Sequence, residues 1–125
     1  FRTHATNKEG IERRIWKYPN FSSLVKTVNL RYRLMPYIYN AAREAYDTGV
    51  SICRPLYYDL PEVNEAYSVE DEYMFGNDIL VAPIVARSKD GVNTERRVWL
   101  PEGMWYNVMR GKMQQGGAWF NDNYG

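Results

Sequence analysis

The stretch FSSLVKTVNLRYRLMPYIYNAAREAYDTG, residues 21–49, carries the most regular hydrophobic pattern of this 125-residue chain and decides its fold class. Apolar side chains recur at steps of three or four residues, the spacing of one helix face. Pro36 has no amide hydrogen to donate to the Tyr32 carbonyl and is expected to kink the axis. We therefore predict one bent helix over residues 21–48, ended by Gly49. The periodic residues are Leu24, Val28, Tyr32, Met35, Tyr39, Ala42 and Tyr46.

A second apolar face accompanies the first along this helix. It consists of Leu30, Leu34, Tyr37 and Ala41. A helix with apolar residues on two faces is typical of a packed interior position rather than of a surface. We expect this helix to be covered on more than one side.

The segments on either side of the helix have other textures. Residues 1–20 mix charges with a glycine and a proline and are expected to form a loop. Residues 51–59 are expected to be extended, although Pro55 argues against a central strand. Ser68, followed three residues later by Asp71, has the spacing of a capping box and predicts a short helix that ends at Phe75.

Short strands separated by turns follow from residue 78. We predict strands over 78–85, 95–100 and 104–109, which suggest an antiparallel meander or sandwich, and a loop around QQGGAW, residues 114–119. One helix with one proline-bearing strand cannot close a core, and three strands leave open edges. The chain is therefore expected to be an excerpt that crosses a domain boundary.

Composition excludes several classes of function. The net charge of +1 provides no broad field for nucleic acid or anionic membrane, so neither partner is expected. The 45% of hydrophobic and 25% of charged residues are typical of a globular protein. No apolar stretch approaches the length of a membrane span. The lone Cys53 allows no internal disulfide and is interpreted as a small buried hydrophobe.

Aromatic residues form 15% of the chain, and 11 of them are tyrosines. One interpretation is a tyrosine-rich core, because tyrosine combines a large buried area with a hydroxyl that reaches a partner. The other is a sugar-handling protein, in which flat rings meet the C–H faces of pyranoses. Composition alone favours the first.

Few side chains offer a catalytic or metal site. His4 is the only histidine, and neither a G-x-S-x-G elbow nor a zinc motif is present, so no metal site is expected. Consecutive Glu70, Asp71 and Glu72 point in different directions on a helix and are interpreted as a solvated acidic turn. Asp59 ends a predicted strand, where a barrel presents its site, but a turn carboxylate is the default interpretation.

Five stretches, in this order, resemble glycoside hydrolase family 31, the family of α-glucosidases and α-xylosidases. They are FRTH at 1–4, LRYRLMPYIYNAAREAYDTG at 30–49, RPLYYDLP at 54–61, YMFGNDILVAPIV at 73–85 and VWLPEGMWYNV at 98–108. The resemblance implies an α/β fold, the end of a (β/α)8 TIM barrel followed by the start of an antiparallel β-sandwich domain, in a fragment of a larger multidomain enzyme. Residues 1–76 would belong to the barrel and 77–125 to the sandwich.

The family resemblance also implies an activity. Its members are retaining glycosidases that use two aspartates in a double displacement and need no cofactor. Both aspartates precede the R-x-H motif, so no catalytic residue is expected in this chain. The motif implies that His4 hydrogen-bonds substrate hydroxyls in the −1 subsite and that Arg2 supports it by pairing carboxylates.

The loop after this motif leaves the substrate open. Many relatives have Pro-Trp there, whereas this chain has Ile15-Trp16, so preference for an α-glucoside or an α-xyloside is undecided. Trp16 is either an aromatic platform for a sugar or a residue packed under the loop. The expected partners are an oligosaccharide or glycoside substrate and the remainder of the parent enzyme, which would pack against this segment. The alternative function is a non-catalytic module that binds a carbohydrate or another partner.

Overall fold

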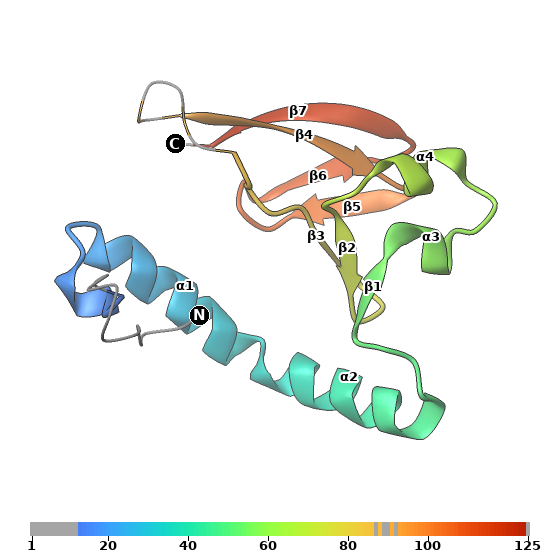
Figure 1. Ribbon diagram of the computed structural model, residues 1–125, viewed down its shortest axis with the longest axis horizontal. Coiled ribbons are helices and arrows are strands. Elements are labelled where there is room, and N and C mark those ends of the chain that lie inside the picture. The colour runs from blue at the N-terminus through green and yellow to red at the C-terminus, as the bar shows by residue number, and fades with distance from the viewer. Residues whose placement is uncertain (1–12, 87, 89–90, 92, 125) are drawn as a thin grey trace, which may run out of the picture. The chain divides into compact units, whose positions relative to one another are not determined.

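The computed structural model describes residues 13–86, 88, 91 and 93–124. The chain divides into two compact units, with the division between Asp47 and Thr48. Helices dominate the first unit, and short strands with two one-turn helices make up the second (Figure 1).

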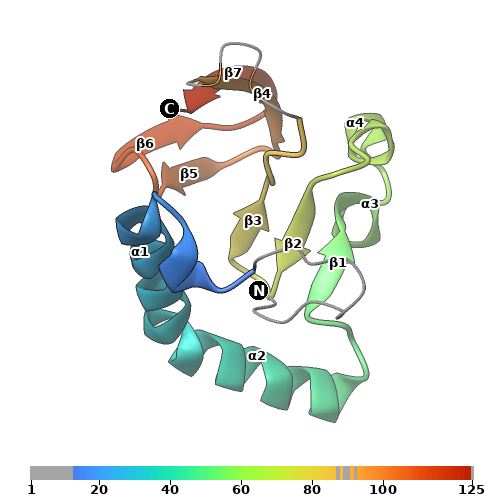
Figure 2. The ribbon, with the colours of Figure 1, turned by 60° about the vertical axis from the view of Figure 1, so that its left-hand side comes forward.

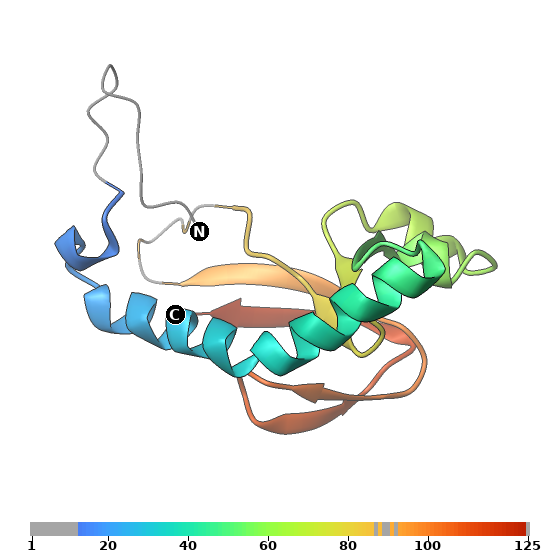
Figure 3. The ribbon, with the colours of Figure 1, turned by 90° about the horizontal axis from the view of Figure 1, so that it is seen from below.

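The first unit contains a short 3-10 helix, η1 (Ile15–Lys17), and two helices, α1 (Phe21–Arg33) and α2 (Met35–Thr48). The prediction of one helix over residues 21–48 was therefore wrong in its continuity, because helical assignment is interrupted at Leu34. Backbone bonds still run through the interruption, from Leu34 N to Leu30 O at 3.0 Å and from Ile38 N to Leu34 O at 2.9 Å. The bond that Pro36 cannot donate weakens the ladder at this point, and the axis bends there (Figure 3).

The two helices bury few side chains against the described residues. None of α1 is buried, and Ala41 is the one buried residue of α2. Tyr32, Tyr39 and Tyr46 expose 70%, 77% and 81% of their surfaces. The expectation of a helix covered on more than one side is therefore not met by the described part of the chain.

The second unit begins with a three-stranded antiparallel sheet, β1 (Cys53–Pro55), β2 (Tyr73–Phe75) and β3 (Ile79–Val81), in the order β1-β2-β3 (Figure 2). Two short helices, α3 (Leu56–Asp59) and α4 (Asn64–Ser68), connect β1 to β2. β1 is an edge strand, and Pro55 lies at its end. The missing amide hydrogen of Pro55 therefore costs no hydrogen bond in the centre of the sheet.

Three local predictions fail in this region. The extended stretch over 51–59 shrinks to β1 because its second half forms α3. The predicted helix over 68–75 is wrong: α4 ends at Ser68, and Tyr73–Phe75 forms β2. Cys53 is exposed rather than buried, because it sits on an edge strand whose next residue turns inward.

Two two-stranded antiparallel ribbons complete the second unit. β4 (Thr94–Leu100) pairs with β7 (Ala118–Tyr124), and β5 (Met104–Asn107) pairs with β6 (Lys112–Gln115). The predicted strands over 95–100 and 104–109 are present with shifted ends, and the one over 78–85 shortens to β3. The loop predicted at 114–119 is wrong, since it contains the end of β6 and the start of β7.

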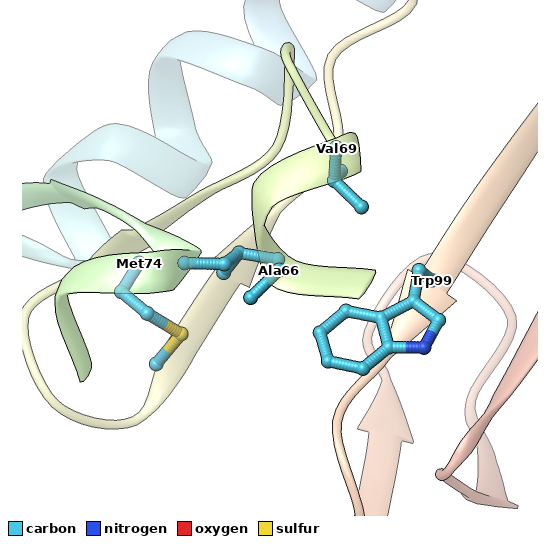
Figure 4. Packing of buried hydrophobic residues seen from close by; sticks show 5 residues of the cluster. Ala66, Val69, Met74 and Trp99 are labelled. Atoms are coloured by element: carbon cyan, nitrogen blue, oxygen red, sulfur yellow. The ribbon is translucent and has the colours of Figure 1, made fainter. Parts of the chain in front are cut away.

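The core of the second unit is a small cluster from α3, α4, β2 and β4. Leu56 and Ala66 are 1% exposed, and Trp99 is 5% exposed. Figure 4 shows the Trp99 ring beside Ala66 and Val69, with Met74 in the same cluster. Because β4 contributes Trp99, the cluster ties the β4–β7 ribbon to the helices that follow β1.

Candidate functional site

The structure describes one of the three residues predicted to bind substrate, Trp16 of the first unit. Arg2 and His4 fall outside the described residues. Trp16 lies in η1, whose turn is closed by a bond from Lys17 N to Arg14 O of 2.9 Å. Trp16 exposes 58% of its surface, so the described residues do not bury its side chain.

Buried Arg54 of β1 organises one polar cluster in the second unit. Its Nε donates to both carboxylate oxygens of Asp59, at 3.1 and 2.9 Å. Its terminal nitrogens donate to Ser51 O at 3.0 Å, to Gly76 O at 3.1 Å and to Asn77 Oδ1 at 3.0 Å. Asp59 is thus the partner of a structural arginine, in agreement with a turn carboxylate.

A second polar cluster contains the acidic residues at 71 and 72. Arg96 of β4 donates from both terminal nitrogens to the Asp71 carboxylate, at 2.6 Å each. Glu72 is 3% exposed, and its Oε1 accepts the Trp99 backbone N–H at 3.1 Å. The interpretation of residues 70–72 as a solvated acidic turn is therefore wrong for Glu72, because tertiary folding brings β4 over it.

The two carboxyl groups have opposite pKa shifts. Hydrogen bonds from Arg96 lower the pKa of Asp71 below its usual value. Loss of solvation on burial raises the pKa of Glu72 to about 7, although the Trp99 N–H and Arg96 oppose the shift. The Arg96 guanidinium thus lies beside two carboxyls, and the more exposed of them, Asp71, keeps its negative charge.

A cavity of about 330 Å³ opens next to this cluster. The Arg97 guanidinium lies over the Trp119 ring, with its Cζ 4.3 Å from the ring centroid. Both side chains form part of the cavity wall. The cavity is lined by Ser68, Val69, Glu70, Asp71, Glu72, Arg96, Arg97 and Trp119.

Carboxyls with separated pKa values are typical of general acid–base sites, but this pair is not arranged for glycoside hydrolysis. Such a reaction needs an acid and a nucleophile that both reach the scissile bond. The Glu72 side chain has no exposed surface, and Asp71 is engaged by Arg96. Among the described residues no group of three His, Cys, Asp or Glu side chains is placed to hold a metal ion.

Sequence reasoning did not find the residues that complete these clusters. Arg96 and Trp99 lie 25 and 27 residues from their partners, Asp71 and Glu72. No local spacing connects them; the only signal was the unusual run of three acidic residues.

The helices of the described residues include none with the length and hydropathy of a transmembrane span.

Comparison with known families assigns both parts of the chain. Residues 1–41 match the TIM-barrel domain of glycosyl hydrolases of family 31, and residues 49–124 match the family's C-terminal domain. The match to the TIM-barrel domain falls on the helical first unit, and the match to the C-terminal domain falls on the second unit with its antiparallel sheets. The chain is therefore of the class of glycosyl hydrolases that join a TIM-barrel domain to a C-terminal domain. The chain belongs to glycosyl hydrolase family 31, which confirms the resemblance inferred from its five motifs.

Individual relatives are much longer enzymes. An α-glucosidase of Saccharolobus solfataricus is 36% identical over 118 residues, which are 93% of this chain and 16% of the relative. An α-xylosidase of the same organism is 35% identical over 105 residues, 82% of this chain and 14% of the relative.

A solved structure shows the same relation. The family 31 α-xylosidase from a soil metagenome, complexed with xylose, superimposes with a TM-score of 0.81 at 39% identity. The match covers 91% of this chain and 17% of that enzyme. The chain thus spans less than a fifth of these relatives.

Proposed function

We propose that this chain is a segment of a retaining α-glycosidase that hydrolyses terminal α-linked glucosyl or xylosyl residues of oligosaccharides. The observation that carries the proposal is the match of nearly the whole chain, 93% of it, to an α-glucosidase at 36% identity. The α-xylosidase at 35% identity supports the same reaction on a different sugar.

The proposed chemistry is a double displacement. One aspartate attacks the anomeric carbon while a second protonates the leaving oxygen; the second then deprotonates a water that releases the sugar from the first. Both aspartates are expected N-terminal to the Arg2-Thr3-His4 motif, so this chain supplies neither. The isolated chain is therefore expected to be inactive.

Substrate contacts are the proposed contribution of this chain. The His4 imidazole can donate or accept a hydrogen bond with a sugar hydroxyl, and the Arg2 guanidinium can pair a carboxylate in the site. Trp16 is proposed as an aromatic platform for a sugar ring, and its 58% exposure supports that role over packing under the loop.

The proposed architecture assigns residues 1–76 to the end of the (β/α)8 barrel and 77–125 to the start of a β-sandwich, although the match to the family's C-terminal domain begins at residue 49. The exposed Tyr32, Tyr39 and Tyr46 support packing of the parent enzyme on the helices, because rings of this size are usually covered. β2 and β3 pair on either side of residues 76 and 77, so the three-stranded sheet would bridge the two domains.

The test uses the parent enzyme and its His4→Ala variant with p-nitrophenyl α-glucoside and α-xyloside. We expect kcat/KM to fall by about 100-fold or more, since the site loses a hydrogen bond that strengthens in the transition state. The control is Tyr106→Ala, an exposed aromatic of β5, which should leave kcat/KM unchanged. Full activity of the His4 variant would remove His4 from the substrate site.

The alternative is a carbohydrate-binding module without catalytic activity, which the exposed aromatics of the first unit favour. Titration calorimetry of the isolated chain with maltose and isomaltose separates the two functions. Binding at millimolar or lower concentration, abolished by Trp16→Ala, would support the module; no binding agrees with a segment that needs its parent.

A further inference from the structure

The contact between β4 and the segment Ser68–Glu72, which joins α4 to β2, rests on few polar groups. Glu72 Oε1 accepts the Trp99 N–H at 3.1 Å, on the edge of β4 that β7 does not cover. Arg96, on the same strand, donates two hydrogen bonds to the Asp71 carboxylate. These bonds close over one side of the Trp99 cluster, so they hold the β4–β7 ribbon to the rest of the second unit.

Charge is unevenly shared in this contact. Both terminal nitrogens of Arg96 lie 2.6 Å from Asp71 oxygens, whereas the nearest approach of Arg96 to Glu72 is 3.6 Å. Glu72 Oε2 is buried without a hydrogen-bond partner among the described residues, and its side chain has no exposed surface. An ionised Glu72 would therefore be a buried second anion beside a cation already paired, an expensive arrangement.

We propose that Glu72 is a proton-operated latch that holds β4 on the segment Ser68–Glu72 while its carboxyl is protonated and loosens this contact when the carboxyl ionises. The protonated group buries no charge and still accepts the Trp99 N–H. The ionised group requires hydration, and the adjacent cavity of about 330 Å³ offers the route by which water reaches it.

Burial and two charged neighbours, Arg96 and Asp71, set the pH at which the latch operates. Arg96 and Asp71 are the nearest, Glu70 and Arg97 line the same cavity, and Tyr124 acts on Arg96 from β7. Burial outweighs their combined effect and raises the pKa of Glu72 to about 7. Glu72 thus changes charge near neutral pH, where an ordinary glutamate is fully ionised.

The direction of the pH effect follows from proton linkage. The folded chain binds the Glu72 proton more tightly than the unfolded chain, whose glutamate has the usual value of 4.5. The stabilisation from this proton is therefore fully present below pH 4.5 and is lost as the pH rises through about 7.

The experiment compares the 125-residue chain with its Glu72→Gln variant by urea unfolding from about pH 5.5 to 8.5. Glutamine keeps the acceptor for Trp99 and cannot ionise. Relative to this variant, the unfolding constant of the original chain should rise by about 30-fold across the range. Glu62→Gln, an exposed glutamate outside the cavity, is the matched control and should follow the original chain at every pH.

Parallel stability curves for the original chain and Glu72→Gln would overturn the proposal. Should the glutamine variant not fold, the original chain still tests the latch by NMR. The Trp99 amide proton is expected to shift with a midpoint near pH 7 and to exchange faster above it, once the intrinsic effect of pH on exchange is removed. An amide that shows no such transition between about pH 6 and 8 would equally overturn the latch. The result is independent of glycosidase activity.

Discussion

Arg54 shows how one buried side chain can define several backbone positions. It is 7% exposed and bonds the residue three before it, the carboxylate five after it and the turn more than twenty residues on. Its planar guanidinium directs donors into a fixed fork, so β1, the end of α3 and the turn between β2 and β3 are held in one geometry. A lysine has a single point charge and cannot repeat that pattern.

Replacement of Arg54 by Ala should destabilise the chain by about 3 kcal/mol, because two backbone carbonyls and Asp59 lose their donors. Urea unfolding measures this loss. Arg43→Ala is the matched control: Arg43 forms an ion pair with Asp47 at 2.7 Å, but its side chain is 68% exposed. The control should change stability by less than about 0.5 kcal/mol. Equal effects of the two variants would show that the Arg54 bonds do not stabilise the fold.

Among the elements of the second unit, the Gly116-Gly117 link between β6 and β7 approaches the end of β4 and the loop that follows it very closely. Gly116 N donates to Gly103 O at 2.7 Å, and Gly117 N donates to Leu100 O at 2.8 Å. A Cβ on Gly116 would lie 3.0 Å from the Trp105 ring and far inside contact distance of the Pro101 carbonyl oxygen. Trp105 Nε1 donates to that same oxygen at 2.8 Å, so neither group is free to move.

Gly116→Ala is expected to destabilise the chain by about 2–3 kcal/mol through this steric conflict. Gly49→Ala is the control, since Gly49 has φ +74° but nothing within 4 Å of an added Cβ. Its cost should be limited to about 1 kcal/mol of backbone strain. Thermal unfolding of the two variants measures the difference. A Gly116 variant as stable as the Gly49 variant would mean that the two ribbons can separate without cost.

At the scale of the whole molecule, the two compact units differ in what they can bury. The core cluster of the second unit draws its members from residues 56–99 and includes none from α1 or α2. The first unit buries Ala41 alone among its described residues. The second unit thus holds a core of its own, whereas the helices depend on further contacts for burial of their apolar faces.

Deletion of residues 1–47 should therefore leave the unfolding midpoint of the Trp99 cluster within about 5 °C of its value in the whole chain. Tryptophan fluorescence during thermal unfolding follows this transition. Deletion of residues 101–125 is the contrasting variant and should abolish it, because β4 loses its pairing with β7. Loss of the transition in the first variant would show that the helices stabilise the β unit.

Features that depend on neighbouring residues in the chain could be predicted from the amino-acid sequence. The helical period of residues 21–48, the end of the helix before Gly49 and the strand texture after residue 78 follow from local spacing, and the order of five motifs was sufficient for the family. Tertiary structure decided the rest, because it depends on contacts between distant residues. Strand β7 exists through its pairing with β4, and the helix expected at 68–75 gave way to β2. Glu72 became a buried group near neutral pKa only because Trp99 and Arg96 fold over it, which removes its water while offering one shared cation.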